Sequence, residues 1–129
     1  MARSDTPKKI GVIVVDHGSR RAESNQLLIE VAELFCQSTG HEIVEPAHME
    51  LAEPTIEMAF DRCVDRGAEL VVVFPYFLGP GRHWHEDIPR LTANAAKEHA
   101  GVQFRVAAPI GKHRLILEIM NDRIRECLD

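Results

Sequence analysis

The chain has 129 residues, of which 45% are hydrophobic, and a formal net charge of −5 at pH 7. This length suits one domain with a single core. The acidic balance argues against general nucleic-acid binding, which needs a basic face to neutralise phosphates. The longest apolar run, Leu70 to Phe74 with Tyr76 to Leu78 beyond Pro75, is far below the ~20 residues needed to cross a bilayer. We therefore expect neither a nucleic-acid nor a membrane partner.

The first eight residues are polar and partly basic, and they precede the first apolar segment. They are too short for a signal or transit peptide of the usual design. We therefore expect a cytoplasmic protein, or a mature form, with a flexible tail over 1–8 and one domain over 9–129. Cys36, Cys63 and Cys127 are far apart and each lies in a predicted helix. We interpret them as reduced thiols that act as small hydrophobic side chains.

The first half of the chain predicts two strands, each followed by a helix. Residues 9–15 are a mostly β-branched run that is typical of a strand covered on both faces, and it ends at Asp16. Residues 24–38 have apolar side chains at helical spacing, and Gly40 stands where that helix would stop. Residues 43–49 predict a strand at the sheet edge, because Pro46 cannot donate a ladder hydrogen bond. A second helix follows, with Pro54 in its first turn.

The second half repeats this alternation. Residues 70–74 predict the most buried strand, and a third helix begins near Asp87. Residues 102–107 predict the fourth strand. The last helix has an apolar stripe of Leu115, Ile116, Ile119, Met120, Ile124 and Leu128. This order predicts an α/β fold with three layers, in which a four-stranded parallel sheet has helices on both faces.

All four strands of such a sheet end at the same edge, where ligands bind in open α/β folds. Chemically active side chains follow each strand in turn: His17; His48 and Glu50; His83 and His85; Lys112 and His113. We therefore expect a metal-handling or acid/base site at this edge. Cationic side chains in the same loops would form a basic rim for an anionic ligand, namely Arg20, Arg21, Arg82, Lys112 and Arg114.

Two of these loops favour a functional histidine. His17 is followed by Gly18 and Ser19, which allow the backbone to approach a ligand. The alternative is a strand-terminal turn whose histidine bonds a backbone carbonyl. His83 follows two glycines and a proline that fix its backbone path, so we prefer His83 to His85 as the functional residue. Asp87 could cap the third helix or orient an imidazole. We interpret Glu86 and Asp87 instead as simple acids of the first helical turn, which the helix dipole favours.

Glu50 together with two histidines would give a two-histidine, one-carboxylate set. Such a set leaves coordination positions open and suits Fe²⁺, Co²⁺ or Zn²⁺. The alternative for Glu50 is a solvated strand end. His41 and His99 lie away from this edge and are interpreted as solvated. The sequence has no Walker phosphate loop, no Gly-x-Gly-x-x-Gly fingerprint and no Gly-x-Ser-x-Gly elbow, which excludes those enzyme classes.

Three sequence blocks, residues 15–21, 45–54 and 80–89, occur in an order that resembles a known family. From Val12 to about Leu128 the chain is similar to the small single-domain sirohydrochlorin chelatases, the cobaltochelatases and ferrochelatases that insert a divalent metal into sirohydrochlorin. The blocks resemble the iron-inserting plant-type branch most. That branch carries a cysteine-rich extension associated with an iron–sulfur cluster, which these residues lack, so we expect no permanently bound cofactor.

The resemblance implies roles for particular residues. His17 would be a metal ligand and proton acceptor, and His83 the second metal ligand. Glu50 would complete the metal set. The tetrapyrrole would be bordered by Glu50, Phe77, Leu78, Gly79, Pro80, Gly81 and Arg82. Sirohydrochlorin is a polycarboxylate, so the cationic side chains at the rim could pair with it, namely Arg20, Arg21, Arg82 and Lys112. An imidazole suits the reaction, because two pyrrole protons must be removed and imidazole ordinarily titrates near ~6.5.

The implied function is a lyase of siroheme or cobalamin biosynthesis that takes Fe²⁺ or Co²⁺ as a substrate. One domain offers one wall to a flat macrocycle, and larger members of the family contain two such halves, so the resemblance implies a homodimer. Two alternatives remain open at this point. A non-enzymatic tetrapyrrole or metal carrier would bind without accelerating metallation, and a small metal-dependent hydrolase would hold zinc tightly.

Overall fold

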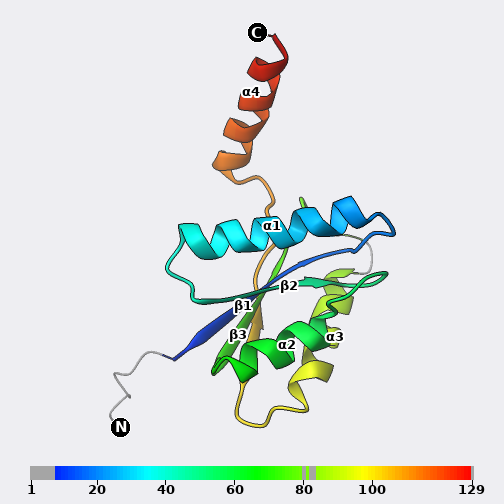
Figure 1. Ribbon diagram of the computed structural model, residues 1–129, viewed down its shortest axis with the longest axis vertical. Coiled ribbons are helices and arrows are strands. Elements are labelled where there is room, and N and C mark those ends of the chain that lie inside the picture. The colour runs from blue at the N-terminus through cyan, green and yellow to red at the C-terminus, as the bar shows by residue number, and fades with distance from the viewer. Residues whose placement is uncertain (1–7, 80, 82–83, 129) are drawn as a thin grey trace.

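The computed structural model describes residues 8–79, 81 and 84–128 (Figure 1). Its elements are β1 (Ile10–Asp16), α1 (Ala22–Ser38), β2 (Ile43–His48), α2 (Ile56–Asp65), β3 (Leu70–Pro75), α3 (Trp84–Ala96), β4 (Gln103–Val106) and α4 (Arg114–Leu128). The strands form one parallel sheet in the order β2-β1-β3-β4. The predicted α/β alternation is confirmed, and the strand that contains Pro46 lies at the edge as expected.

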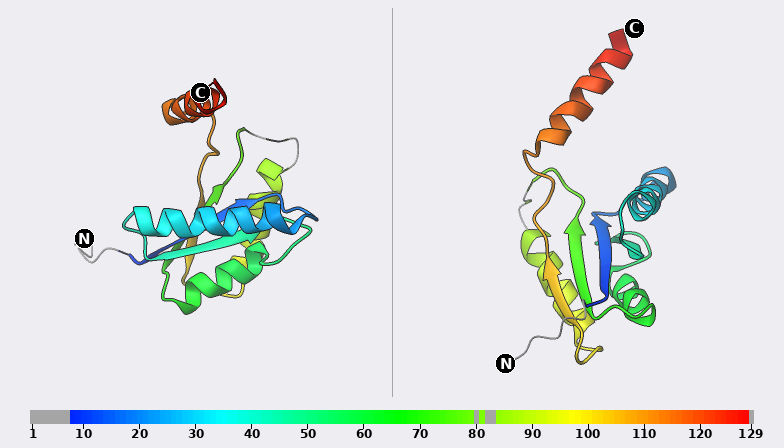
Figure 2. Two further views of the ribbon diagram at one scale, coloured as in Figure 1. Left: turned by 45° about the horizontal axis from the view of Figure 1, so that its top comes forward. Right: turned by 90° about the vertical axis from the view of Figure 1, so that its left-hand side faces the viewer.

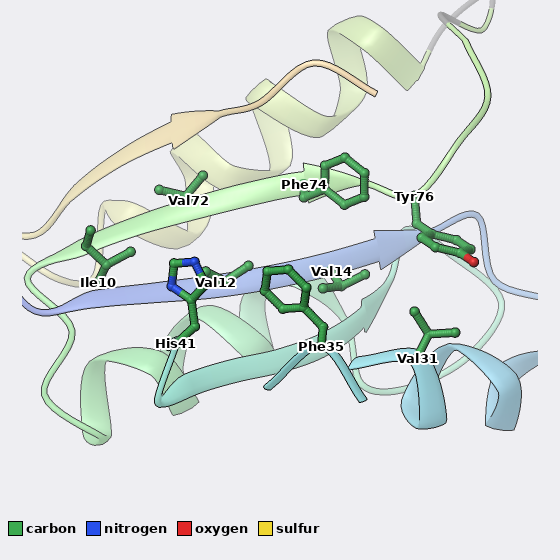
Figure 3. Close-up of a pocket in the computed structure, with 9 residues that line it drawn as sticks. All are labelled: Ile10, Val12, Val14, Val31, Phe35, His41, Val72, Phe74 and Tyr76. Atoms are coloured by element: carbon green, nitrogen blue, oxygen red, sulfur yellow. The ribbon is translucent and has the colours of Figure 1, made fainter. Parts of the chain in front are cut away.

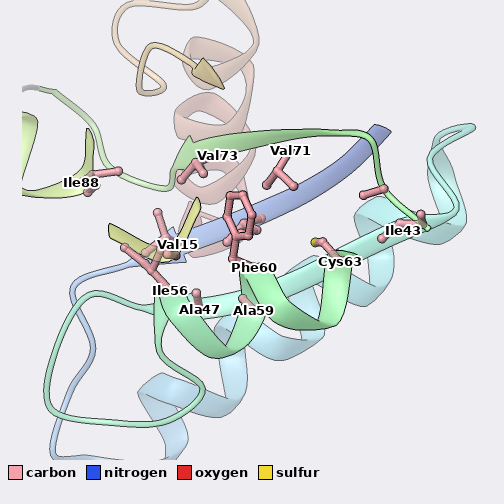
Figure 4. Packing of buried hydrophobic residues seen from close by; sticks show 13 residues of the cluster. Val15, Ile43, Ala47, Ile56, Ala59, Phe60, Cys63, Val71, Val73 and Ile88 are labelled. Atoms are coloured by element: carbon pink, nitrogen blue, oxygen red, sulfur yellow. The ribbon is translucent and has the colours of Figure 1, made fainter. Parts of the chain in front are cut away.

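Helices lie on both faces of the sheet, and the side chains of β1 alternate between the two faces. Ile13 and Val15 are fully buried against α2 and α3, in a cluster that includes Phe60 (Figure 4). Val12 and Val14 point the other way and pack with buried residues of α1. Strand β1 is therefore enclosed from both sides, as its continuous apolar run predicts.

Helix α4 departs from the prediction of a helix that packs on the sheet. None of its residues is buried, and it extends away from the carboxyl edge of the sheet (Figures 1 and 2). Ile119, Met120 and Ile124 of the predicted stripe are each more than half exposed. The periodic pattern identifies an apolar face but not the surface that covers it. Neither α4 nor another helix of the described segments has the length and apolarity needed to span a membrane.

The starts of two helices also differ from the sequence prediction. Helix α2 begins after Thr55, whose Oγ1 accepts a hydrogen bond from the backbone N–H of Met58 at 3.2 Å. Thr55 is thus the N-cap, and Pro54 precedes the helix instead of lying in its first turn. Helix α3 begins at Trp84, before the predicted start near Asp87.

Two histidines that were predicted to be solvated are in fact half-buried. His41 stacks on Phe35 with ring centroids 5.4 Å apart. His99 has its Nε2 2.6 Å from Oδ1 of Asp61 and also stacks on Phe60. Both imidazoles fix loops at the amino edge of the sheet, so they have a structural use away from the predicted site.

Candidate functional site

The carboxyl edge of the sheet brings His17 and Glu50 together. The backbone N–H of Met49 donates to the carbonyl of Asp16 at 2.8 Å, and that of Glu50 donates to the carbonyl of His17 at 3.0 Å. These bonds continue the β1–β2 pairing past the ends of the strands. Glu50 is therefore held beside His17, as the shared exit of parallel strands predicts, and both residues are exposed.

The His17 imidazole has an aromatic wall on one side. Its ring meets Phe77 edge-on, with centroids 4.7 Å apart and an interplanar angle of 66°. Phe77 belongs to the segment after β3, and its carbonyl accepts from the N–H of Ile110 at 2.9 Å. The exits of β1, β2 and β3 thus meet around one solvent-facing imidazole, and the loop before α4 supports the aromatic ring.

Gly18 allows the His17 loop to lie directly on the Glu50 backbone. Its φ is +88°, and a Cβ at this position would stand 1.8 Å from the Glu50 carbonyl oxygen. A side chain would therefore clash with backbone and also strain the left-handed conformation. The Gly18 N–H donates to Oδ1 of Asp16 at 2.9 Å, which fixes the turn.

His48 does not join the exposed side chains at this edge, which corrects the sequence interpretation. It is fully buried, and its Nδ1 lies 2.6 Å from Oδ1 of Asp16, its register partner on β1. The sequence shows both residues at predicted strand ends, but only the strand register reveals that they face each other.

The other predicted substrate-binding residues that the structure describes lie in the segments after β1 and β3. Arg20 and Arg21 are exposed just before α1, and Leu78 is 68% exposed. The Leu78 carbonyl accepts from the N–H of Gly111 at 2.6 Å, which ties its loop to the segment before α4. Gly79 follows in the same loop.

Of residues 80–83, which continue this loop, the structure describes only Gly81. Pro80, Arg82 and His83 lie outside the described residues. The Gly81 carbonyl accepts from Nδ1 of His85 at 3.0 Å.

Asp87 pairs with Arg90 at 3.0 Å. This pairing favours a half-buried carboxylate of the first helical turn over one that orients an imidazole.

The described side chains include no group of three or more His, Cys, Asp or Glu that converges as a metal site. The predicted ligand set consists of His17, Glu50 and His83. His83 lies outside the described residues, so the structure places only His17 and Glu50 of this set. Cys63 is unsuited to metal binding, because burial and the nearby Glu45 carboxylate raise the pKa of its thiol to about 12. Cys63 thus fits the predicted role of a small hydrophobic side chain, whereas Cys127 is exposed and does not.

An exposed imidazole and an aromatic wall beside the Glu50 segment at the carboxyl edge define an open α/β protein with a candidate ligand site at the usual position for this fold. Residues 11–127 match the CbiX family model. The chain belongs to this family, which confirms the resemblance seen in the sequence.

Two relatives illustrate the range of lengths. The chain is 60% identical over 118 residues to the sirohydrochlorin ferrochelatase, chloroplastic, of Arabidopsis thaliana, which covers 92% of this chain and 52% of that protein. It is 31% identical over 139 aligned positions to the sirohydrochlorin cobaltochelatase of Methanopyrus kandleri, covering 92% and 97%. The chain thus spans about half the length of the Arabidopsis relative. Because that relative is named chloroplastic, the cytoplasmic location stays a prediction.

Solved structures agree with the fold. SirB from Bacillus subtilis with Fe³⁺ has a TM-score of 0.84 at 28% identity, covering 92% of this chain and 47% of that one. A putative cobalamin biosynthesis CbiX protein from Marinobacter aquaeolei VT8 has a TM-score of 0.78 at 34% identity, covering 92% and 97%. The predicted parallel sheet with helices on both faces is therefore confirmed.

Proposed function

We propose that this protein is a sirohydrochlorin chelatase, a lyase that inserts Fe²⁺ or Co²⁺ into sirohydrochlorin and releases two protons. The observation that carries the proposal is the meeting of the His17 imidazole, the Phe77 ring and the Glu50 segment at one open edge of the sheet. Membership of the CbiX family supports it, since relatives are named as sirohydrochlorin ferrochelatase and cobaltochelatase. The product would serve siroheme or cobalamin biosynthesis.

The metal ion is a substrate in this reaction and not a resident cofactor. We assign His17 as a metal ligand and as acceptor of a pyrrole proton, with His83 and Glu50 as further ligands. A sparse set of protein ligands suits insertion, because open coordination positions let the ring nitrogens replace the protein. Imidazole and carboxylate ligands accept both iron and cobalt.

The macrocycle would lie against the apolar side chains of Phe77 and Leu78 and along the segment Gly79–Arg82. Leu78 is largely exposed, which leaves apolar surface for a flat ring. Sirohydrochlorin carries several carboxylates, and Arg20 and Arg21 are exposed beside the His17 loop. Their guanidinium groups would orient the ring by charge-assisted hydrogen bonds, although the chain as a whole is acidic.

The test is an anaerobic assay with sirohydrochlorin and either Fe²⁺ or Co²⁺, followed by the visible spectrum of the ring. His17→Ala should lower the rate by about 100-fold or more, because it removes a proton acceptor and a ligand. His99→Ala is the matched control, since it removes an imidazole at the opposite edge and should keep the rate. Wild-type turnover by His17→Ala would refute the assigned role.

The same assay, together with elemental analysis of the purified protein, separates this function from its alternatives. A carrier would bind the metallated ring and give no faster metallation than the free ion in solution. A hydrolase would retain zinc through purification, which elemental analysis detects.

We further propose that the protein is a homodimer in which the two copies exchange α4. One domain supplies one wall to a flat ring, so a second copy would supply the other. The apolar face of α4 is exposed, with Ile119, Met120 and Ile124 each more than half accessible. An apolar face of this kind on a helix is ordinarily covered in solution.

The surface that fits α4 is an apolar groove on the sheet beside α1 (Figure 3). It has a volume of about 380 Å³ and is lined by Ile10, Val12, Val14, Val31, Phe35, His41, Val72, Phe74 and Tyr76. A helix of 15 residues is roughly 22 Å long and a strand of six residues roughly 20 Å, so their lengths match. Because α4 points away from its own sheet, a second copy is the partner that we assign.

Sedimentation analysis tests this assembly. The wild type should have twice the 14.5 kDa mass of one chain at micromolar concentration. Met120→Glu places a charge on the apolar face and should give monomers, whereas Asn121→Glu, at a polar position outside the apolar stripe, should leave the dimer intact. A monomeric wild type, or a dimer that Met120→Glu does not weaken, would contradict the exchange of α4.

A further inference from the structure

A hydrogen bond between buried His48 and partly exposed Asp16 joins the two segments that carry His17 and Glu50. Asp16 immediately precedes His17 and lies opposite His48 in the parallel register of β1 and β2. A carboxylate can only accept, so the 2.6 Å contact is a hydrogen bond that Nδ1–H of His48 donates to Oδ1 of Asp16. The same oxygen accepts from the Gly18 N–H at 2.9 Å. One carboxylate therefore fixes both the end of β2 and the loop that presents His17.

The burial of His48 indicates that its hydrogen bond to Asp16 is the reason for a histidine at this position. The residue is 0% exposed, and its Nε2 has no hydrogen-bond partner among the described residues. An unpaired buried nitrogen costs stability, and an apolar side chain of similar size would avoid that cost. The feature that only histidine adds here is the donor that reaches Asp16.

The backbone hydrogen bonds between the His17 and Glu50 segments require a further restraint of this kind. His17 and Glu50 are both exposed, and the bond from the Glu50 N–H to the His17 carbonyl lies beyond the ends of the strands. Bonds in this situation open readily, because water competes for them and few apolar contacts hold them closed. The Asp16–His48 bond lies deeper in the fold and restrains the same two segments.

We propose that Asp16 and His48 are a positioning pair that sets the spacing of His17 and Glu50 without touching the substrate. The functional part of this inference rests on the proposed chelatase, in which His17 and Glu50 face the metal. The structural part, a restraint on the Glu50 backbone, stands independently of it.

Two substitutions at His48 separate a positioning role from simple packing. His48→Phe fills the space without a donor, whereas His48→Asn keeps a side-chain N–H near the place of Nδ1. Hydrogen exchange at the Glu50 amide, followed by NMR without metal, should become about tenfold faster in His48→Phe. His48→Asn should restore the exchange rate to within about threefold of the wild type.

The metal readout uses Co²⁺ alone, titrated by its visible absorption. The dissociation constant for Co²⁺ should rise about tenfold in His48→Phe and recover in His48→Asn, the range found for groups that orient metal ligands. Thr92→Val is the control, because Thr92 is also fully buried and its hydroxyl donates to the Ile88 carbonyl at 2.7 Å. It should lower the melting temperature and leave both readouts unchanged.

Each outcome decides between the two roles. An unchanged Glu50 exchange rate in a folded His48→Phe variant would overturn the positioning pair. So would an equal effect of His48→Phe and His48→Asn on both readouts. A wild type that binds no Co²⁺ would instead refute the metal role of His17, and the Glu50 amide would still decide whether the pair positions the loop.

Discussion

Gly18→Ala tests the close approach on which the candidate site depends. The added Cβ would stand 1.8 Å from the Glu50 carbonyl oxygen, whereas real Cβ contacts stay beyond 3.0 Å. The His17 loop and the Glu50 backbone must therefore move apart by more than about 1 Å, a shift large enough to cost about 100-fold in rate when it separates reacting groups. We expect kcat/KM of metal insertion to fall by about that factor.

Gly101→Ala supplies the matched control. Gly101 has the same φ of +88°, but nothing lies within 4 Å of its added Cβ. Both variants place alanine in the left-handed region, at a cost of about 1–2 kcal/mol of unfolding free energy. Only Gly18→Ala adds a clash with backbone, so its stability should fall further, and only its activity should be lost.

Urea denaturation and the anaerobic insertion assay measure the two effects separately. If Gly18→Ala lost no more stability than Gly101→Ala and retained full activity, the contact between the His17 loop and Glu50 would have no bearing on the site. A large loss of stability with normal activity would show that the loop relaxes without moving His17.

The remaining predictions concern the fold. The folded-state pKa of the Cys63 thiol is raised to about 12 from an ordinary 9.0, so its stabilising contribution is complete below pH 9 and is lost as pH rises from 9 toward 12. The unfolding free energy should fall with a slope approaching about 1.4 kcal/mol per pH unit in that window, and equal slopes for Cys63→Ala and the wild type in urea titrations would contradict this. Thr55→Ala should lower the unfolding free energy by about 1 kcal/mol, because it removes the N-cap of α2. Thr55→Ser keeps the hydroxyl and should retain most of the wild-type stability. Equal losses in both Thr55 variants would show that the hydroxyl does not cap the helix.

The sequence predicts the sheet and its functional edge because local patterns determine both. The β-branched run of β1 predicts a strand enclosed from two sides, and Pro46 predicts an edge strand. Parallel strands share an exit, so His17 and Glu50 were expected to meet although they are distant in the chain. Their backbone contact confirms that expectation.

Other features depend on geometry that local patterns do not contain. The inward orientation of His48 follows from the strand register that pairs it with Asp16. This register cannot be read from the sequence of either strand alone. The partners of His41 and His99 come from other elements, which explains why both were interpreted as solvated. Likewise, the apolar stripe of α4 is visible in the sequence but its covering surface is not.

The segment that leads into α4 is hydrogen-bonded to the loop that carries Phe77 of the candidate site. The loop before α4 donates from the N–H groups of Ile110 and Gly111 to the carbonyls of Phe77 and Leu78, at 2.9 Å and 2.6 Å. Phe77 is in turn the aromatic wall of His17. Docking α4 on a second copy would therefore restrain this wall at the same time as it closes the ring site from the other side.

This coupling predicts that dimerisation and activity change together. Met120→Glu should produce monomers with normal far-UV circular dichroism and a raised KM for sirohydrochlorin, because the second wall is lost and the Phe77 loop is less restrained. Asn121→Glu should keep both the dimer and the wild-type KM. A monomeric Met120→Glu variant with unchanged kcat and KM would show that one copy forms the whole site, and that α4 serves assembly alone.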